Sequence, residues 1–143
     1  TWKKSSALPQ NISPNKLTRI CEFVFVFCRK SEQSSFHMNK SVDSVSKKGQ
    51  MIYSNEFNYL EAPNNDGSCE LNKATFSTSL VRKLLLMYGK EGGVVYDSFM
   101  GTGTTAIGAL KENMKFIGSE ISEPQCTYAR ERIEMEQSEL SLF

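Results

Sequence analysis

The sequence has 143 residues and is poor in the side chains that build metal centres. It contains a single histidine, His37, and four cysteines that form no Cys-x-x-Cys pair. This pattern favours neither a zinc site nor a disulfide framework, so we expect no metal ion and reduced thiols. No apolar run approaches the length of a membrane span and no signal peptide is recognisable, so we expect a cytoplasmic protein with no membrane partner.

Two further motifs that would indicate a particular ligand or reaction are absent. No Gly-Lys-Ser or Gly-Lys-Thr follows a glycine turn, which excludes a Walker-type phosphate loop. The chain has four prolines, and no two of them are adjacent. What remains is an ordinary globular composition, with 39% hydrophobic and 23% charged residues, and a length that suits one compact domain.

The net charge of +1 conceals an uneven distribution. Residues 1–50 hold nine Lys or Arg against three Asp or Glu, a net charge of +6, whereas residues 51–143 have a net charge of −5. Clustered basic side chains supply the sequence-independent part of DNA affinity, because the DNA phosphates release their counterions when Lys or Arg side chains bind them. A solvated surface with ordinary lysines is the alternative interpretation of the same cluster.

One segment joins a predicted strand, a glycine turn and a predicted helix. Apolar residues 94–96 predict the strand, Asp97 follows it, and residues 106–111 predict a helix after a Gly-x-Gly turn. Such a turn exposes backbone N–H groups to a ligand. A second predicted strand, Phe116 to Ser119, ends at Glu120. A carboxylate at the end of the next strand can accept hydrogen bonds from the ribose hydroxyls of a bound nucleoside.

The identity of the nucleoside is the open question. Gly101-x-Gly103-x-x-Ala106 also satisfies the dinucleotide fingerprint, so a nicotinamide or flavin cofactor is an alternative. Asp97 argues against that alternative, because a carboxylate beside the loop repels a pyrophosphate and attracts an ammonium or sulfonium group. A turn that only lets the helix pack on the strand is the remaining interpretation.

Other patterns predict the rest of the chain. We expect a loop over Ser5–Asn15, a strand buried on both faces over Ile20–Cys28, and an irregular segment over Ser31–Gln50. A short strand within Met51–Asn58 is also expected. Ser77 predicts the N-cap of a helix over Thr78–Tyr88, which Gly89 ends. The last helix begins with the capping box Ser122-Glu123-Pro124-Gln125, packs through Tyr128, Ala129, Ile133 and Met135, and frays from Glu134.

The chain resembles the DNA methyltransferases that modify exocyclic amines, and three motifs carry the resemblance. Their cofactor motif, usually Asp-Pro-Phe-x-Gly-Ser/Thr-Gly-Thr-Thr, is similar to Asp97-Ser98-Phe99-Met100-Gly101-Thr102-Gly103-Thr104-Thr105. Their second cofactor-contacting motif, which precedes the loop directly in the beta-type motif order, is similar to Lys73-Ala74-Thr75-Phe76-Ser77 and the following Leu80 to Tyr88. The hairpin that closes their sheet is similar to Trp2-Lys3-Lys4, Leu8-Pro9 and Glu22-Phe23-Val24-Phe25-Val26-Phe27. Ser98 and Ser77 replace prolines of the family pattern, and neither change removes a ligand-contacting group.

The resemblance implies an α/β fold, namely the Rossmann-like class I methyltransferase fold with strand order 3-2-1-4-5-7-6. Residues 94–96 and 116–119 would be strands 1 and 2, and the segments around Trp2 and Phe23 would be strands 6 and 7. Strands 4 and 5 have no counterpart in the chain. We therefore expect an incomplete fold with unpaired apolar edges, which an upstream segment or a second chain completes.

The resemblance also implies S-adenosyl-L-methionine as the cofactor and double-stranded DNA as the partner. The implied cofactor contacts are Asp97, Phe99, Gly101, Gly103 and Thr104 at the loop, Glu120 on the ribose, and Thr75 and Phe76 as a wall of the site. Residues 1–30 would form the closing hairpin, residues 31–72 a variable region that is the candidate for target recognition, and residues 73–143 the cofactor-binding half. Lys40, Lys47 and Lys48 are the candidate DNA contacts.

The expected reaction is methyl transfer to an exocyclic amine of adenine or cytosine in DNA, in a bacterial or virus-infected cell. In this family an Asp/Ser/Asn-Pro-Pro-Tyr/Phe motif holds the target base, and the chain has no Pro-Pro pair. No catalytic residue is therefore assigned, and we expect residues 1–143 alone to be inactive. A non-catalytic methyltransferase half that binds DNA or a partner is the alternative.

Overall fold

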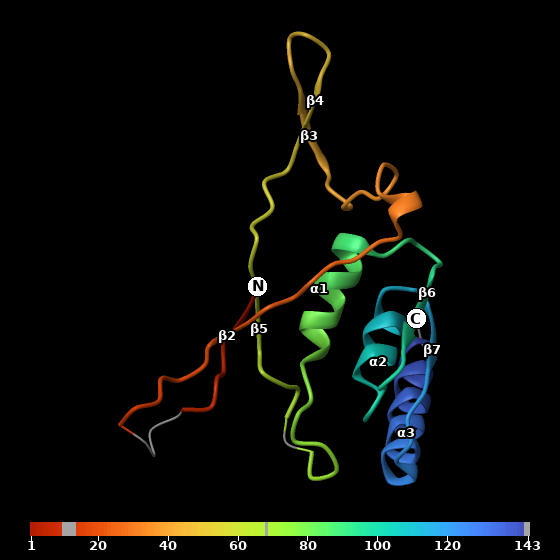
Figure 1. Cartoon of the computed structure of the whole chain (residues 1–143). Helices are drawn as coiled ribbons and strands as arrows, with labels where there is room; N and C mark the ends of the chain where they lie inside the picture. Colours follow the sequence, from red (N-terminus) through yellow and green to blue (C-terminus); the bar gives the residue numbers. More distant parts are fainter. Residues whose placement is uncertain (10–13, 68, 142–143) are drawn as a thin grey trace.

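The computed structural model describes residues 1–9, 14–67 and 69–141 (Figure 1). Residues 10–13 of the expected Ser5–Asn15 loop lie outside the described residues. The elements are β1 (Trp2–Lys4), β2 (Cys21–Glu22), the 3-10 helix η1 (Lys30–Glu32), β3 (Val42–Val45), β4 (Met51–Tyr53), β5 (Leu60–Ala62), α1 (Thr78–Tyr88), β6 (Val94–Asp97), α2 (Thr104–Lys111), β7 (Lys115–Gly118) and α3 (Glu123–Leu140).

The C-terminal half is a strand–helix–strand–helix unit. β6 and β7 are parallel neighbours, with Val95 opposite Phe116 and Asp97 opposite Gly118, and α2 forms the crossover between them. α2 packs against β6, β7, α1 and α3. Gly108 of α2 permits the approach of α1, because a Cβ there would lie 2.5 Å from Cγ1 of Val81. The predicted order of strand, glycine turn, helix and strand is confirmed.

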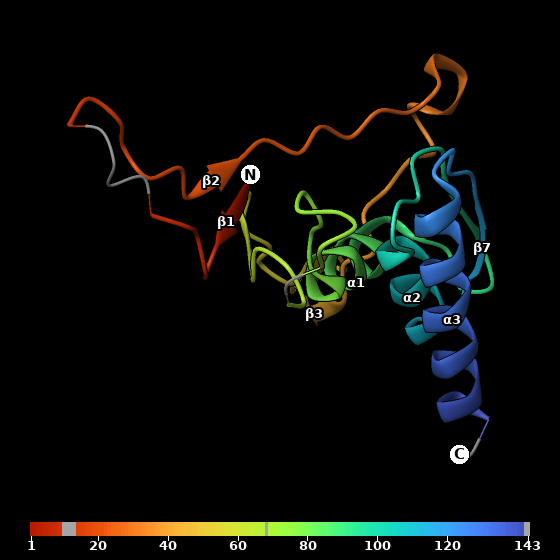
Figure 2. The same cartoon turned by 90° about the horizontal axis from the view of Figure 1, so that it is seen from below.

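α1 begins and ends where the sequence predicts. The hydroxyl oxygen of Ser77 accepts a hydrogen bond from the N–H of Leu80 at 3.3 Å, which is the N-cap contact. Asp66 adds a second cap, because its carboxylate accepts from the N–H of Thr78 at 2.8 Å. At the other end the N–H of Gly89 donates to the carbonyl of Leu85 at 2.7 Å. α1 contacts β5 on one side and α2 on the other, so it joins the two halves (Figure 2).

The N-terminal half contains a three-stranded sheet in the order β2-β1-β5. β1 pairs antiparallel with β2, as the resemblance implies for strands 6 and 7, and parallel with β5. Trp2 anchors this sheet: its side chain is buried with Ala62 and Leu80, and its indole N–H donates to the carbonyl of Ala62 at 3.2 Å. The sheet and α1 thus share a small hydrophobic core.

The expected strand over Ile20–Cys28 is wrong beyond Glu22. Only Cys21 and Glu22 pair with β1, and the next residues run past α1 without strand partners among the described residues. The side chains of Phe23, Phe25 and Phe27 are therefore 82%, 73% and 86% exposed instead of buried. A strand is a paired structure, and an alternating apolar pattern does not create one where no neighbour supplies hydrogen bonds.

The expected irregular segment over Ser31–Gln50 is also partly wrong. Val42–Val45 forms β3, which pairs antiparallel with β4 in a hairpin that projects away from the rest of the molecule (Figure 1). The short strand expected within Met51–Asn58 is confirmed as β4. Gly49 turns the chain with a positive φ of 78°, and the N–H of Gln50 donates to the hydroxyl of Ser46 at 3.0 Å. β3 has only four residues and is followed by serine and lysines, so its alternating pattern is too short to predict a strand.

α3 differs from the expectation in three ways. Ser122 is its N-cap residue, but its side chain makes no cap hydrogen bond. The other half of the capping box is also absent, because the Ser122 N–H donates to Glu120 at 2.8 Å and the Gln125 side chain accepts from Asn72 at 3.0 Å. The helix does not fray at Glu134 but continues to Leu140, and Lys111 of α2 bonds Glu136 at 2.5 Å. Met135 is 66% exposed and does not pack inside.

No helix in the described part of the chain covers one face of the β6–β7 pair. Val94 and Tyr96 on β6 and Ile117 on β7 project from the same face, and their side chains are 59%, 65% and 59% exposed. The apolar strands therefore lack the second helical layer that a doubly covered parallel sheet has. None of the helices in the described part of the chain is long and apolar enough to span a membrane.

Candidate functional site

The glycine turn lies at the carboxyl ends of β6 and β7. Gly101 and Gly103 have φ angles of +55° and +85°, a region that side chains with a Cβ rarely adopt. The N–H of Gly103 donates to the carbonyl of Met100 at 3.0 Å, and the N–H of Met100 donates to the carbonyl of Ser119 at 2.9 Å. The turn is therefore bonded both to itself and to the end of the neighbouring strand.

Asp97 ends β6 and holds the turn from one side. Its Oδ1 accepts from the N–H of Phe99 at 2.9 Å, and its Oδ2 accepts from the hydroxyl of Thr105 at 2.5 Å. These two bonds join the last residue of the strand to the first turn of α2. Phe99 itself points its ring into solvent, with 87% of its surface exposed, and so presents an apolar face at the outside of the loop.

Glu120 follows β7 and holds the turn from the other side. Its Oε2 accepts from the N–H of Gly101 at 2.9 Å, and its Oε1 accepts from the N–H of Ser122 at 2.8 Å. The bond from Ser122, and after it the bond from Gly101, lowers the pKa of Glu120 below its ordinary value, while burial acts in the opposite direction. The carboxylate is therefore charged at neutral pH and lies within the loop.

The two glycines also have a packing role. A Cβ on Gly103 would lie 3.1 Å from Cβ of Ala129 on α3, and a Cβ on Gly101 would lie 3.0 Å from the side-chain nitrogen of Asn72. α3 and the segment before α1 therefore approach the loop closely. These close approaches confirm in part the interpretation that the turn lets helices pack. They leave room for a ligand on the side of the turn that faces away from α3 and Asn72.

Thr75, Phe76 and Thr104 share a different surface. They line a cavity of about 150 Å³ together with Asp66, Gly67, Cys69, Thr102, Tyr128 and Arg132. Asp97, Phe99 and Glu120 are not among its described lining residues. The structure therefore gathers the predicted cofactor residues into two groups, one around the carboxylates and one beside the N-terminus of α2.

Sequence reasoning missed Arg132 in this second group. Its guanidinium donates to the carbonyl of Thr102 at 2.7 Å and lies 3.4 Å from the hydroxyl of Thr104, over the ring of Tyr128. The interaction fixes the last part of the glycine turn to α3. Arg132 follows Ala129 by three positions, so a helical projection places it beside a packing residue, but nothing in the sequence connects it to the loop.

The predicted DNA-contacting lysines lie in or near the projecting hairpin. Lys47 and Lys48 are in the turn between β3 and β4, and Lys40 precedes β3. All three are exposed, and no ion pair of theirs with the described residues is present. Among the described residues, no cluster of three or more His, Cys, Asp or Glu side chains suits a metal ion.

Comparison with known proteins identifies the family. The model of the DNA methylase family N6_N4_Mtase matches residues 1–131. The orphan methyltransferase M.BamHII of Bacillus amyloliquefaciens is 40% identical over 83 residues, which are 54% of this chain and 31% of that protein. The type II methyltransferase M.Cfr9I of Citrobacter freundii is 27% identical over 135 residues, 94% of this chain and 43% of that protein. The chain thus spans less than half the length of these curated relatives.

A solved structure establishes the fold. The M1.HpyAVI–SAM complex has a TM-score of 0.57 and 19% sequence identity, and the match covers 92% of this chain and 58% of that one. The predicted Rossmann-like class I fold is confirmed in partial form. From the family match, the parallel strand–turn–helix unit and the two carboxylates beside its glycine turn, we conclude that this chain belongs to the family of N6 and N4 DNA methylases.

Proposed function

We propose that this chain is the cofactor-binding part of an enzyme that transfers a methyl group from S-adenosyl-L-methionine to an exocyclic amine of adenine or cytosine in double-stranded DNA. The observation that carries the proposal is the pair of carboxylates, Asp97 and Glu120, at the ends of two parallel strands and on either side of one glycine turn. Family membership supplies the class of reaction.

The residues at the turn fit this cofactor. Each oxygen of Glu120 accepts one backbone N–H, so lone pairs remain for the two hydroxyls of a ribose. Asp97 brings a negative charge to the loop, and it suits the cationic methionine part better than a pyrophosphate. The exposed ring of Phe99 offers an apolar surface beside both carboxylates.

The proposed roles draw on both groups of residues. Asp97, Phe99, Gly101, Gly103 and Thr104 contact the methionine part and the loop side of the cofactor, and Glu120 binds the ribose. Thr75 and Phe76, which line a cavity with Thr104, wall the site from the side of α1. Arg132 holds the turn through Thr102 and is a positioning residue.

The cofactor, when bound, supplies a methyl group on a sulfonium, which an amine displaces directly. The task of this chain is therefore to orient the cofactor and leave its methyl side open, since positioning lowers the barrier of such a displacement. The groups that hold the target amine are not in this sequence, which has no Pro-Pro pair. We assign them to a segment outside these 143 residues.

We also propose that this other segment, in the same chain or a second one, completes the sheet. An apolar cavity of about 440 Å³ separates the segment after β2 from β6, and its lining includes Val24, Phe25, Leu84, Val94 and Val95. In the family strand order, strands 4 and 5 lie between the counterparts of these two segments. Two apolar strands there would cover surface that is now exposed.

DNA is proposed to contact the hairpin of β3 and β4. A two-stranded ribbon fits the major groove, and the turn of this hairpin carries Lys47 and Lys48. Lys40 lies near the base of the hairpin and would contact the DNA backbone. This assigns target recognition to residues 31–72, between the closing hairpin of residues 1–30 and the cofactor-binding half of residues 73–143.

Calorimetry with S-adenosylhomocysteine, the reaction product, tests the cofactor assignment. The complete protein should bind it and should not bind NAD. Glu120→Ala should weaken the binding on the order of tenfold to a hundredfold, because it removes the partner of buried hydroxyls. Glu123→Gln is the control, since this glutamate is exposed and lies outside the loop. Binding of NAD, or equal affinity of wild type and Glu120→Ala, would overturn the assignment.

A further inference from the structure

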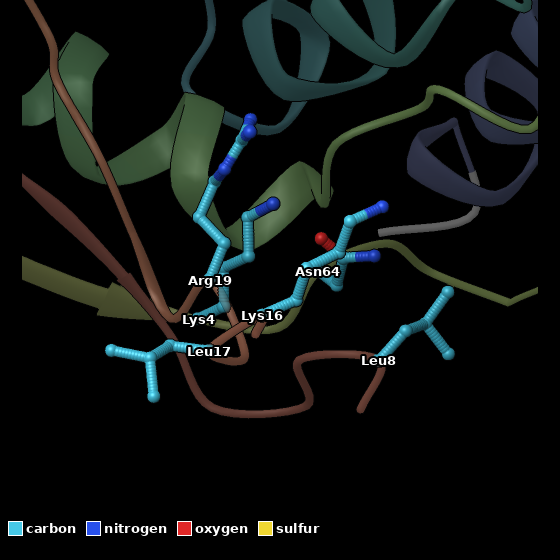
Figure 3. Close-up of a pocket in the computed structure, with 6 residues that line it drawn as sticks. All are labelled: Lys4, Leu8, Lys16, Leu17, Arg19 and Asn64. Carbon is cyan, nitrogen blue, oxygen red and sulfur yellow. The ribbon is translucent and has the colours of Figure 1, made fainter. Parts of the chain in front are cut away.

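A cavity of about 600 Å³ lies beside the first strand, and none of its described lining residues belongs to the glycine turn (Figure 3). Its described lining residues are Lys4, Leu8, Lys16, Leu17, Arg19 and Asn64. Half of them are cations, and no acid is among them. The cavity therefore presents positive charge from two segments, β1 and the residues before β2.

Backbone bonds hold the walls of this cavity in place. The N–H of Lys4 donates to the carbonyl of Ile20 at 2.8 Å, and the N–H of Ser5 donates to the carbonyl of Ala62 at 3.0 Å. The N–H of Asn64 donates to the hydroxyl of Ser6 at 3.0 Å. Three segments distant in sequence are thus tied together around the basic side chains.

Two of the three cations carry uncompensated charge. Lys4 forms an ion pair with Glu22, and its side chain is only 14% exposed. Lys16 and Arg19 are exposed and have no ion pair with the described residues. Glu22 is the single acid in residues 1–30, which contain six Lys or Arg. The cavity therefore has a net positive charge that nothing in the described chain neutralises.

Two of the three cationic side chains point the same way. In Figure 3 the side chains of Lys4 and Arg19 run beside each other in the same direction, whereas Leu17 points away from them. Leu8 and Leu17 are 72% and 94% exposed and form an apolar rim. A guanidinium next to ammonium groups is the combination that binds a phosphate, the first in a bidentate manner and the others as point charges.

We propose that this cavity binds phosphates of the DNA backbone through Lys16 and Arg19, with Lys4 as a fixed third cation. The inference deepens the proposed function, because it takes DNA as the substrate and adds a contact apart from the β3–β4 hairpin, which lies at the opposite end of Figure 1. A duplex is favoured over a free anion because the cations remain exposed to water. One phosphate alone binds such a site weakly, whereas linked phosphates that reach a second contact gain effective concentration.

The test is DNA binding by the double variant Lys16→Gln/Arg19→Gln of the complete protein, measured by fluorescence anisotropy over a range of salt concentrations. Loss of two phosphate contacts should lower the slope of log affinity against log salt by up to about two, and weaken binding equally across DNA sequences. Lys90→Gln/Lys115→Gln is the matched control, since it removes the same charge at two exposed lysines near β6 and β7. Its slope should stay near that of the wild type.

Three results would overturn the proposal: an unchanged slope in the Lys16→Gln/Arg19→Gln variant, an equal loss in both double variants, or competition by inorganic phosphate without any effect of the variant on DNA. If the variant does not fold, the alternative experiment follows the NMR signal of the Arg19 side chain in the wild-type protein. That signal should shift on addition of duplex DNA, and a constant signal would refute the contact. Binding of S-adenosylhomocysteine is measured in parallel, so a failure of the methyl-transfer proposal is seen separately from a failure here.

Discussion

Asp97 and Glu120 act on the same turn from two strands. Asp97 accepts from Phe99 and Thr105, and Glu120 accepts from Gly101 and Ser122. Each carboxylate therefore orders the backbone before any ligand binds. A loop that is already ordered loses less conformational entropy on binding, so the two carboxylates proposed to bind the cofactor would also prepare its site.

The pH dependence of stability tests the structural part of this role. The pKa of Glu120 is lowered in the folded protein from its ordinary value of 4.5, so its contribution to stability is complete above that value and is lost as the pH falls through the lowered folded-state pKa. The free energy of unfolding should therefore decrease with acidification below pH 4.5 more in the wild type than in Glu120→Gln. Parallel pH curves for both proteins would show that the two backbone bonds contribute nothing.

The glycine at position 103 allows a separate prediction, with Gly92 as its control. Both have a positive φ, +85° for Gly103 and +66° for Gly92, but only Gly103 has a neighbour, Ala129, within 3.1 Å of an added Cβ. Gly92→Ala should cost about 1 kcal/mol of unfolding free energy from backbone strain alone. Gly103→Ala should cost at least about 2 kcal/mol, because α3 must also move.

Denaturant unfolding of both variants in the complete protein measures the difference. Equal losses of unfolding free energy would mean that α3 yields without cost, and that the turn does not depend on its contact with Ala129.

At the scale of the elements, the β3–β4 hairpin is the one with the least support from the rest of the molecule. Every residue of its two strands is exposed, and it projects as a free ribbon (Figure 1). A hairpin that buries nothing against the core does not stabilise the fold, since an isolated pair of strands is marginal in water. The proposed contact with DNA would explain why a hairpin with a basic turn projects into solvent.

Removing Lys47 and Lys48 together tests that explanation. Lys47→Gln/Lys48→Gln in the complete protein should weaken DNA binding about equally across sequences and reduce the salt slope by up to about two. Thermal stability should not change, because neither side chain forms an ion pair with the described residues. Affinity and slope equal to those of the wild type would leave the two lysines as solvated residues of a loop.

At the scale of the whole molecule, the exposed apolar surface is the dominant feature. Val94, Tyr96 and Ile117 on one face of β6 and β7, and the phenylalanines after β2, are all more than half exposed. Contiguous apolar surface next to unpaired strand edges promotes association between chains. This exposed surface is what we expect if, as proposed, the central strands of the sheet come from another segment.

Expression of residues 1–143 alone tests this conclusion. The fragment should be aggregated, insoluble or dependent on a partner, and it should transfer no methyl group from radiolabelled S-adenosylmethionine to unmethylated DNA. Adding a segment that contains the Pro-Pro motif, in the same chain or as a second one, should restore both solubility and transfer. A soluble, cooperatively melting and active 143-residue monomer would show that the strand assignment is wrong and that catalysis uses other residues.

The sequence alone determined the strand–turn–helix–strand unit of the C-terminal half. Local signals specify its parts: apolar residues before Asp97, two glycines that need a positive φ, Ser77 as an N-cap and Gly89 as a terminator. Each of these depends on contacts within a few residues, so each could be identified without knowledge of the rest of the chain. The acid after the second strand, Glu120, followed from the same local order.

The tertiary structure decided what depends on distant partners. The run after Glu22 is apolar enough for a buried strand, yet pairing with β1 ends at Glu22 and no other described strand lies beside the run. Gln125 bonds Asn72 instead of closing a capping box, and Arg132 reaches Thr102 from α3. The cavity of Lys4, Lys16 and Arg19 likewise exists only because β1 and the loop before β2 are held together. Hydrogen bonds and charges between residues far apart in sequence leave no local pattern, and for that reason only the folded chain reveals them.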